Sequence, residues 1–348
     1  MDKSLPIILI QNTNYHFETL ISVYQILKNL GYNPHIYRYL PDKFNQLEFI
    51  QYYGMNIATQ PVIDSAYCAF VISAYPNPHV TKDTCIPNDD NIIFSKFKNR
   101  LIYISHRFMK EEDYNEDGLI NRNNALCLSP LSSKIGIDYI YLTDTPITPV
   151  NNPLNKLKLT IQAHFGLQNR SYQLLYKMIR LYRGYTNTNI KYNIIGTETH
   201  QVLPKIMDKI PQLNISRYEG MDELDFYNIL NTKTNWIICG IQPLDKRGSY
   251  LCERYSSNFN HALALEKPII CHESFKNIYE IPGYYYSDTH DVEYLSNSTG
   301  IIDDISKINN TEYMNMIDSF KNLKQKFTLH NQKILHSKIE YISEHQYV

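Results

Sequence analysis

Residues 250–271 (YLCERYSSNFNHALALEKPIIC) combine side chains that could bind a phosphate group. Ser256, Ser257 and Asn258 are favoured helix N-cap residues, and a helical pattern follows them directly. Because a helix amino end presents free N–H groups, hydroxyl side chains beside it would complete a site suited to a diphosphate. The apolar run 269–271 then predicts a buried strand. The segment is either an ordinary helix-to-strand unit of an α/β core or part of a nucleotide-handling enzyme.

The elements that must position this segment are short apolar runs alternating with helical patterns, which is typical of parallel α/β folds. Strands are predicted at 6–10, 35–39, 68–73, 101–105, 125–129, 157–161, 190–195, 236–239 and 268–271. Helices are predicted at 16–30, with Gly31 as the stop signal, and at 171–182, 259–265 and 312–342. The proline-rich segment 143–154 (TDTPITPVNNPL) indicates a linker between two domains.

Composition narrows the class of protein. The 348-residue chain holds 34 basic and 35 acidic residues, a balance that argues against a long nucleic-acid partner and against a polybasic membrane anchor. Its six cysteines form no CxxC pair, so we expect a reducing compartment and no structural zinc. We find neither a signal-peptide pattern nor an apolar run long enough to span a bilayer, and therefore expect a cytoplasmic protein.

The same segment resembles the GT-B class of glycosyltransferases. Retaining members carry a Glu-x7-Glu motif before an Ala-Met-Ala-x-Gly-x-Pro helix and strand. Here Glu253 stands at the first motif position, His261 replaces the second glutamate, and residues 262–268 (ALALEKP) keep the spacing. The resemblance implies that Glu253 contacts the donor sugar and that His261 takes the ribose-binding position. Glu253 could equally be a surface carboxylate paired with Arg254 or Arg247, and Tyr250 could line the donor pocket.

A second stretch, residues 157–196, is similar to the same family in its order of strand, glycine-containing loop, basic residue and strand ending in glycine. By this likeness Gly166 lets the backbone approach the donor phosphates, and Arg170 neutralises the diphosphate. Gly196 would lie where the nucleotide base passes. Arg170, together with the helix start at Ser256, Ser257 and Asn258, would stabilise the leaving group without a metal.

Two histidines of the first half could act as the base that an inverting transfer requires. His16 follows the first predicted strand, where inverting members of the class carry their base, and His106 ends the fourth. Asn12, Thr13 and Asn14 share the loop of His16 and could bind acceptor hydroxyls. Glu253 favours retention and His16 favours inversion, so the stereochemical outcome stays open.

The resemblance predicts an α/β fold with two Rossmann-like domains facing across a cleft, and a C-terminal helix packing back on the first domain. We expect an acceptor domain at 1–150, a nucleotide-sugar donor domain at 151–310 and a helical tail at 311–348. The expected function is hexosyl transfer from a UDP- or GDP-type sugar to a glycan, glycoprotein or other hydroxyl acceptor, with no cofactor and no metal. The alternatives are a catalytically silent GT-B-fold binding protein and a sugar-nucleotide epimerase.

Overall fold

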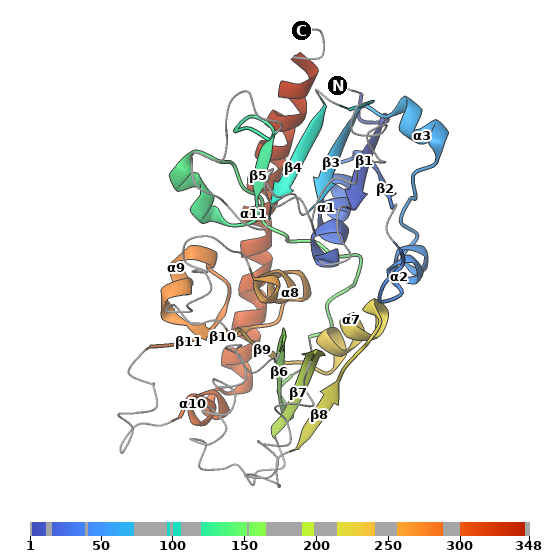
Figure 1. The fold of residues 1–348 in the computed structure, drawn as a ribbon. Helices are drawn as coiled ribbons and strands as arrows, with labels where there is room; N and C mark the ends of the chain where they lie inside the picture. Colours follow the sequence, from blue (N-terminus) through green and yellow to red (C-terminus); the bar gives the residue numbers. More distant parts are fainter. Residues whose placement is uncertain are drawn as a thin grey trace. The chain divides into compact units, whose positions relative to one another are not determined.

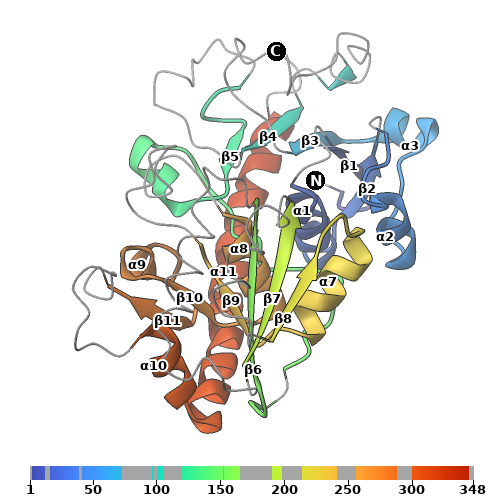
Figure 2. The ribbon, with the colours of Figure 1, turned by 60° about the horizontal axis from the view of Figure 1, so that its bottom comes forward.

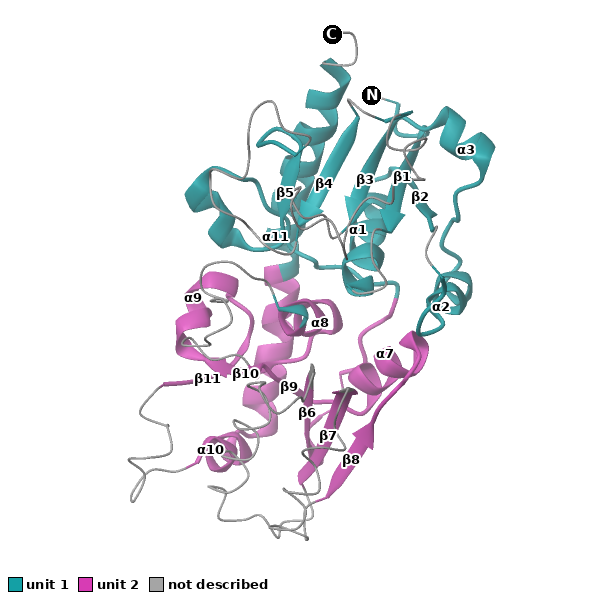
Figure 3. Ribbon diagram, in the orientation of Figure 1, with its two compact units in different colours: residues 1–146, 252–257, 324–348 teal, residues 147–251, 258–323 magenta. Residues whose placement is uncertain are grey.

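The computed structural model (Figure 1) describes residues 2–11, 16–38, 41–72, 96–97, 100–105, 120–151, 153–164, 190–197, 214–240, 256–287 and 300–344. Contacts within the chain divide it into two compact units (Figure 3). Unit 1 comprises residues 1–146, 252–257 and 324–348, and unit 2 comprises residues 147–251 and 258–323. The boundary after Pro146 lies in the proline-rich segment 143–154. Within the described ranges, no helix is both long and apolar enough to cross a bilayer.

Unit 1 is built on a five-stranded parallel sheet in the order β2-β1-β3-β4-β5. Its strands are β1 (Pro6–Gln11), β2 (Asn33–Tyr37), β3 (Cys68–Ile72), β4 (Leu101–Ser105) and β5 (Ala125–Cys127). The apolar runs of β3 and β4 are buried throughout, as expected for parallel strands covered on both faces. Because β1 leads to β2 on one side and β3 lies on the other, the strand order reverses between β1 and β3.

The helices of unit 1 follow the strands. Helix α1 (Phe17–Asn29) ends where predicted, with Gly31 in the left-handed region at φ 82° and the Tyr32 N–H donating to the Leu27 carbonyl over 3.0 Å. The shorter helices were not predicted from the sequence; they are α2 (Gln46–Tyr52), α3 (Gln60–Ser65) and the 3₁₀ helix η3 (Pro130–Ile135).

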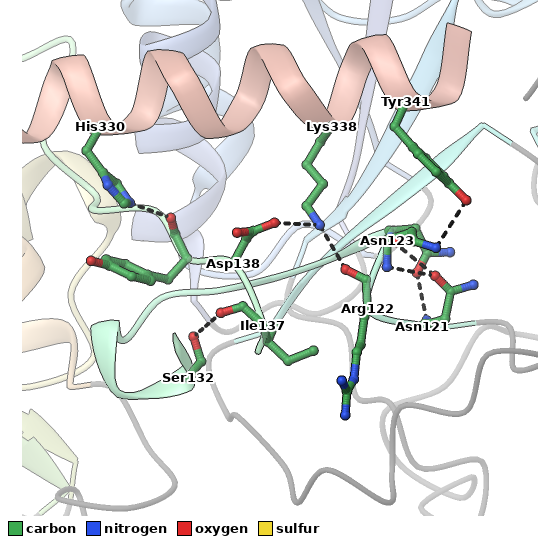
Figure 4. A network of polar contacts seen from close by, with 11 residues as sticks. Asn121, Arg122, Asn123, Ser132, Ile137, Asp138, His330, Lys338 and Tyr341 are labelled. Carbon is green, nitrogen blue, oxygen red and sulfur yellow. Dashed lines mark hydrogen bonds and ion pairs between the residues drawn. The ribbon is translucent and has the colours of Figure 1, made fainter. Parts of the chain in front are cut away.

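The 35-residue helix α11 (Asn310–Glu344) supplies residues to both units, and its part from Lys324 onward belongs to unit 1. The buried Asn331 amide pairs with both the N–H and the carbonyl of Tyr141, over 2.9 and 2.7 Å. Figure 4 shows His330 and Lys338 directed from the same helix toward the segment before this tyrosine. The prediction that the terminal helix packs back on the first domain is therefore confirmed.

Unit 2 is built on a six-stranded parallel sheet in the order β11-β10-β9-β6-β7-β8. Figure 2 shows β6, β7 and β8 side by side. The predicted strands are β6 (Leu157–His164), β7 (Ile190–Thr197), β9 (Trp236–Ile238) and β10 (Ile269–His272). The two edge strands, β8 (Ile215–Tyr218) and β11 (Gly283–Tyr286), were not predicted. A Cβ at Gly283 would lie 2.2 Å from the Ile269 carbonyl oxygen, so this edge pairing requires glycine.

Helices pack against this second sheet and complete its hydrophobic core. They are α7 (Glu223–Thr232), α8 (Ser257–Leu265, of which Ser257 is counted with unit 1), η4 (Glu273–Phe275), α9 (Lys276–Tyr279), α10 (Ile301–Lys307) and the first part of α11. Trp236 and Leu159 of the sheet share one buried cluster with Ile305 of α10 and Tyr313 of α11. The predicted helix 171–182 lies outside the described residues.

Candidate functional site

The strand order of unit 2 identifies the carboxyl ends of its two central strands as the place for a ligand. From β6 the chain proceeds to β7 and β8 on one side, and β9, β10 and β11 lie on the other. Ligands of open parallel sheets bind at the carboxyl ends of the strands where the order reverses, which here is between β6 and β9. The loops that leave this point begin after His164 and after Ile238.

The sequence that follows these two strands contains four of the residues predicted for the donor. Gly166 and Arg170 follow β6 by two and six positions in the sequence, and Tyr250 and Glu253 follow β9. All four lie outside the described residues, so the structure gives only the ends of the strands that precede them. The ends of both strands are at the reversal of strand order, which is where open parallel sheets bind their ligands.

Helix α8 has its polar amino end on the side of the sheet where the carboxyl ends of the strands lie. It connects β9 to β10, which are parallel, so its first turn lies at the carboxyl ends of the strands. Ser256 precedes the helix, Ser257 opens it, and both Ser256 and Asn258 are buried. Because the first N–H groups of a helix have no partner within the helix and lie at the positive end of its dipole, an anion placed here would be stabilised. We call Ser256, Ser257 and Asn258 the α8 tip.

Gly196 is the penultimate residue of β7 and is paired in register with Ala163 of β6. Its φ of 153° lies in the region that favours glycine. The residue therefore stands at the carboxyl edge, one strand away from the reversal point, with a backbone conformation that a side chain would disfavour.

His261, at the second position of the glutamate motif, is a buried residue of α8 with 2% of its surface exposed. Its ring centroid lies 5.3 Å from that of Phe226 and 5.5 Å from that of Tyr227, both edge-on and both from α7. The imidazole thus contributes to the packing of α8 against α7. The sequence pattern placed His261 in the helix but gave no indication of these aromatic neighbours.

The carboxyl end of α8 departs from the family motif. The Lys267 N–H donates to the Ala262 carbonyl over 2.9 Å, which is the closing bond of a Schellman turn. Such a turn requires a left-handed residue before its last position, and here that residue is Glu266 at φ 55°, where the motif has glycine. A non-glycine residue in this conformation costs on the order of 1–2 kcal/mol.

Lys267, directly after this turn, is a buried charged residue that the sequence analysis did not identify. Its side chain is 1% exposed, and its ammonium donates to the Val150 carbonyl over 2.5 Å and to Asn151 Oδ1 over 3.3 Å. Burial disfavours the charged form and lowers the pKa of Lys267 to about 8, although the neighbouring Glu266 carboxylate opposes this shift. The sequence feature that could have indicated a buried lysine is its position directly before Pro268 and a buried strand.

In unit 1 the strand order reverses between β1 and β3, and His16 lies after the carboxyl end of β1, at the start of α1. His16 is left-handed at φ 61°, one third of its side chain is exposed, and its Nδ1 lies 3.3 Å from Glu18 Oε1. A proton on Nδ1 that is donated to Glu18 leaves Nε2 as the basic nitrogen, the arrangement that a general base uses. At the end of β1, Gln11 donates to Gln46 over 2.8 Å, and both side chains are buried.

The remaining residues predicted for the first half lie outside the described ranges; they are Asn12, Thr13, Asn14 and His106. The first three directly follow β1, and His106 directly follows β4. Within the described parts of the chain, no three His, Cys, Asp or Glu side chains gather as a metal site would require.

Known structures resemble the chain over nearly its whole length. A glycosyltransferase from Rickettsia africae ESF-5 aligns with a TM-score of 0.59 and 11% identity, covering 98% of this chain and 99% of that one. AviGT4, a glycosyltransferase involved in avilamycin A biosynthesis, aligns with a TM-score of 0.51 and 8% identity, covering 97% and 98%. No protein-family model and no curated protein sequence matches the chain. At these identities the likeness concerns the fold, and the chain has the GT-B fold of these glycosyltransferases.

Proposed function

We propose that the protein transfers a hexose from a nucleoside-diphosphate sugar of UDP or GDP type to a hydroxyl group of a glycan or other acceptor, without a metal. The observation that carries this proposal is the α8 tip, a hydroxyl-rich helix start in which Ser256 and Asn258 are buried, at the carboxyl ends of the parallel strands β9 and β10. Diphosphates bind in such places because backbone N–H groups and the helix dipole stabilise their charge.

The leaving diphosphate gains negative charge as the glycosidic bond breaks, and preorganised donors that face this charge are the largest catalytic contribution. In the proposed reaction Arg170, which follows β6 in the sequence, binds the diphosphate together with the α8 tip. Glu253, which follows β9 in the sequence, binds hydroxyl groups of the donor sugar, and Tyr250 and Gly166 line the same pocket. His16 accepts the acceptor proton if the transfer inverts, and its contact with Glu18 supports this assignment.

A catalytically silent binding protein is the second candidate, and the packing of His261 supports it. An imidazole among the rings of Phe226 and Tyr227 takes the place of a carboxylate in the motif. Such a protein would keep nucleotide binding and lose transfer.

The test is an assay of the full-length protein with radiolabelled UDP- and GDP-sugars, following both transfer and hydrolysis of the donor. Arg170→Ala should lower turnover at least about tenfold, the scale of one lost charge-assisted contact. Glu253→Gln should impair transfer more than it impairs folding. Arg217→Ala is the matched control because Arg217 is an exposed arginine of the edge strand β8.

Three results would contradict the assignment. Turnover that is independent of Arg170 would remove this residue from the site. A Glu253→Gln protein that is merely unstable would make Glu253 a structural residue. Nucleotide binding without any donor turnover would favour the silent binding protein.

A further inference from the structure

Three side chains bind the first residues of unit 2. Asn231, at the end of α7, accepts the Val150 N–H on Oδ1 over 2.8 Å and donates from Nδ2 to the Thr148 carbonyl over 2.9 Å. Lys267 donates to the Val150 carbonyl, and Glu266 accepts from Asn151 Nδ2 over 3.1 Å. We call Asn231, Glu266 and Lys267 the linker clamp. It joins residues 148–151 to the carboxyl ends of two helices.

We propose that Lys267 is a positioning residue for the diphosphate site, because the linker clamp fixes the carboxyl end of α8 and thereby the α8 tip at its other end. The proposal rests on the function proposed above. Lys267 touches neither donor nor acceptor in this account, and it acts through the helix that precedes it.

Helix α8 has the properties needed to transmit a displacement along its length. Every side chain from Asn258 to Leu265 is buried, and Phe259 stacks on Tyr279 at 4.1 Å between ring centroids. Nine residues span about 13 Å at 1.5 Å per residue, so a shift at one end moves the other end as well. Close-packed interiors transmit such shifts because their side chains have no free volume to absorb them.

The chemical nature of Lys267 also favours a role beyond packing. The described contacts of its ammonium are two neutral oxygens, and the adjacent Glu266 carboxylate bonds Asn151. A methionine would fill a similar volume without the cost of removing an ammonium group from water. A buried charge at this position, combined with the left-handed strain of Glu266 beside it, indicates that the geometry of this end of α8 matters.

The test compares full-length wild type with Lys267→Met, Lys267→Arg and Asn231→Ala by hydrogen exchange and by calorimetric titration with UDP and with GDP. Lys276→Met is the control, since Lys276 is an exposed lysine of α9 in the same unit. In Lys267→Met we expect exchange at least about tenfold faster both in residues 148–151 and in residues 260–263 of α8. We also expect at least about fivefold weaker binding of the nucleotide that wild type prefers. Lys267→Arg, which keeps the charge and the donors, should recover part of both losses.

Faster exchange confined to residues 148–151, with the exchange of α8 and the nucleotide affinity unchanged, would overturn the proposal. Lys267 would then stabilise only the conformation of residues 148–151. If Lys267→Met does not fold, Asn231→Ala decides by the same two measurements. If wild type binds neither nucleotide, the proposed function fails, and the exchange of α8 still decides whether the clamp controls that helix.

Discussion

Each unit of this protein contains a buried lysine that holds a segment of chain without regular secondary structure, and the two lysines have different partners. Lys338 of unit 1 lies 2.8 Å from the Asp138 carboxylate and donates to the Arg122 carbonyl over 2.8 Å (Figure 4). Lys267 of unit 2 donates to the neutral oxygens of Val150 and Asn151.

The difference separates two uses of a buried cation. An ion pair whose carboxylate is half exposed, as Asp138 is, retains hydration and gives a modest net stabilisation. A buried ammonium with neutral partners has a lowered pKa, because its charged form has lost water without gaining a bonded carboxylate. We infer that unit 1 uses its lysine for stability and that unit 2 uses its lysine for position.

The largest expected effect is the pH dependence of Lys267→Met. The folded-state pKa of Lys267 is about 8 against an ordinary value of 10.5, so between these two values the unfolded chain binds more protons than the folded one. The contribution of Lys267 to stability therefore rises with pH. The destabilisation by Lys267→Met should be small at pH 7 and grow by about 2–3 kcal/mol at pH 10.

Denaturant unfolding of wild type and variant at both pH values measures this change. Lys276→Met serves again as the exposed control, because groups that titrate elsewhere affect all three proteins alike. A destabilisation that is equal at pH 7 and pH 10 would show that Lys267 is not a lysine with a lowered pKa.

An intermediate effect is expected in unit 1. Lys338→Met removes the ion pair to Asp138 and the hydrogen bond to Arg122 and should cost about 1–2 kcal/mol of unfolding free energy. Because the carboxylate is half exposed, the cost should decrease as salt is raised. Denaturant unfolding at low and high salt measures it, with the exposed Lys333→Met of the same helix as control. A cost that is independent of salt would show that the hydrogen bond dominates.

The smallest expected effect on unfolding free energy is at the carboxyl end of α8, where a glutamate takes the left-handed position that a glycine takes in α1. Both helices end in a Schellman turn, with Gly31 in one and Glu266 in the other at the left-handed position. Glu266→Gly relieves about 1–2 kcal/mol of backbone strain but loses the bond to Asn151 and increases the entropy of the unfolded chain. The net change in unfolding free energy should lie within about 1 kcal/mol.

The matched variant is Gly31→Ala, whose added Cβ would meet nothing closer than Lys3 Cδ at 3.9 Å, so it should cost about 1–2 kcal/mol from the backbone alone. Thermal and denaturant unfolding of both variants provide the measurement. A loss of more than 2 kcal/mol in Glu266→Gly would mean that the carboxylate contributes more than one ordinary hydrogen bond.

The sequence was sufficient for the elements whose cause is local. Buried apolar runs predicted the central strands, helical spacing and Gly31 predicted α1, and the serines at 256–257 predicted the start of α8. The edge strands β8 (ISRY) and β11 (GYYY) escaped prediction because an edge strand needs no continuous buried apolar run.

The tertiary structure alone decided how these elements meet. The reversal between β6 and β9 depends on which strands pair, and strand pairing joins residues far apart in the sequence. The same holds for His261 against the rings of α7 and for Lys267 against residues 150–151, which precede it by more than a hundred positions. Local propensity carries no information about such partners, because their energies come from burial and hydrogen bonds that exist only after the chain has folded.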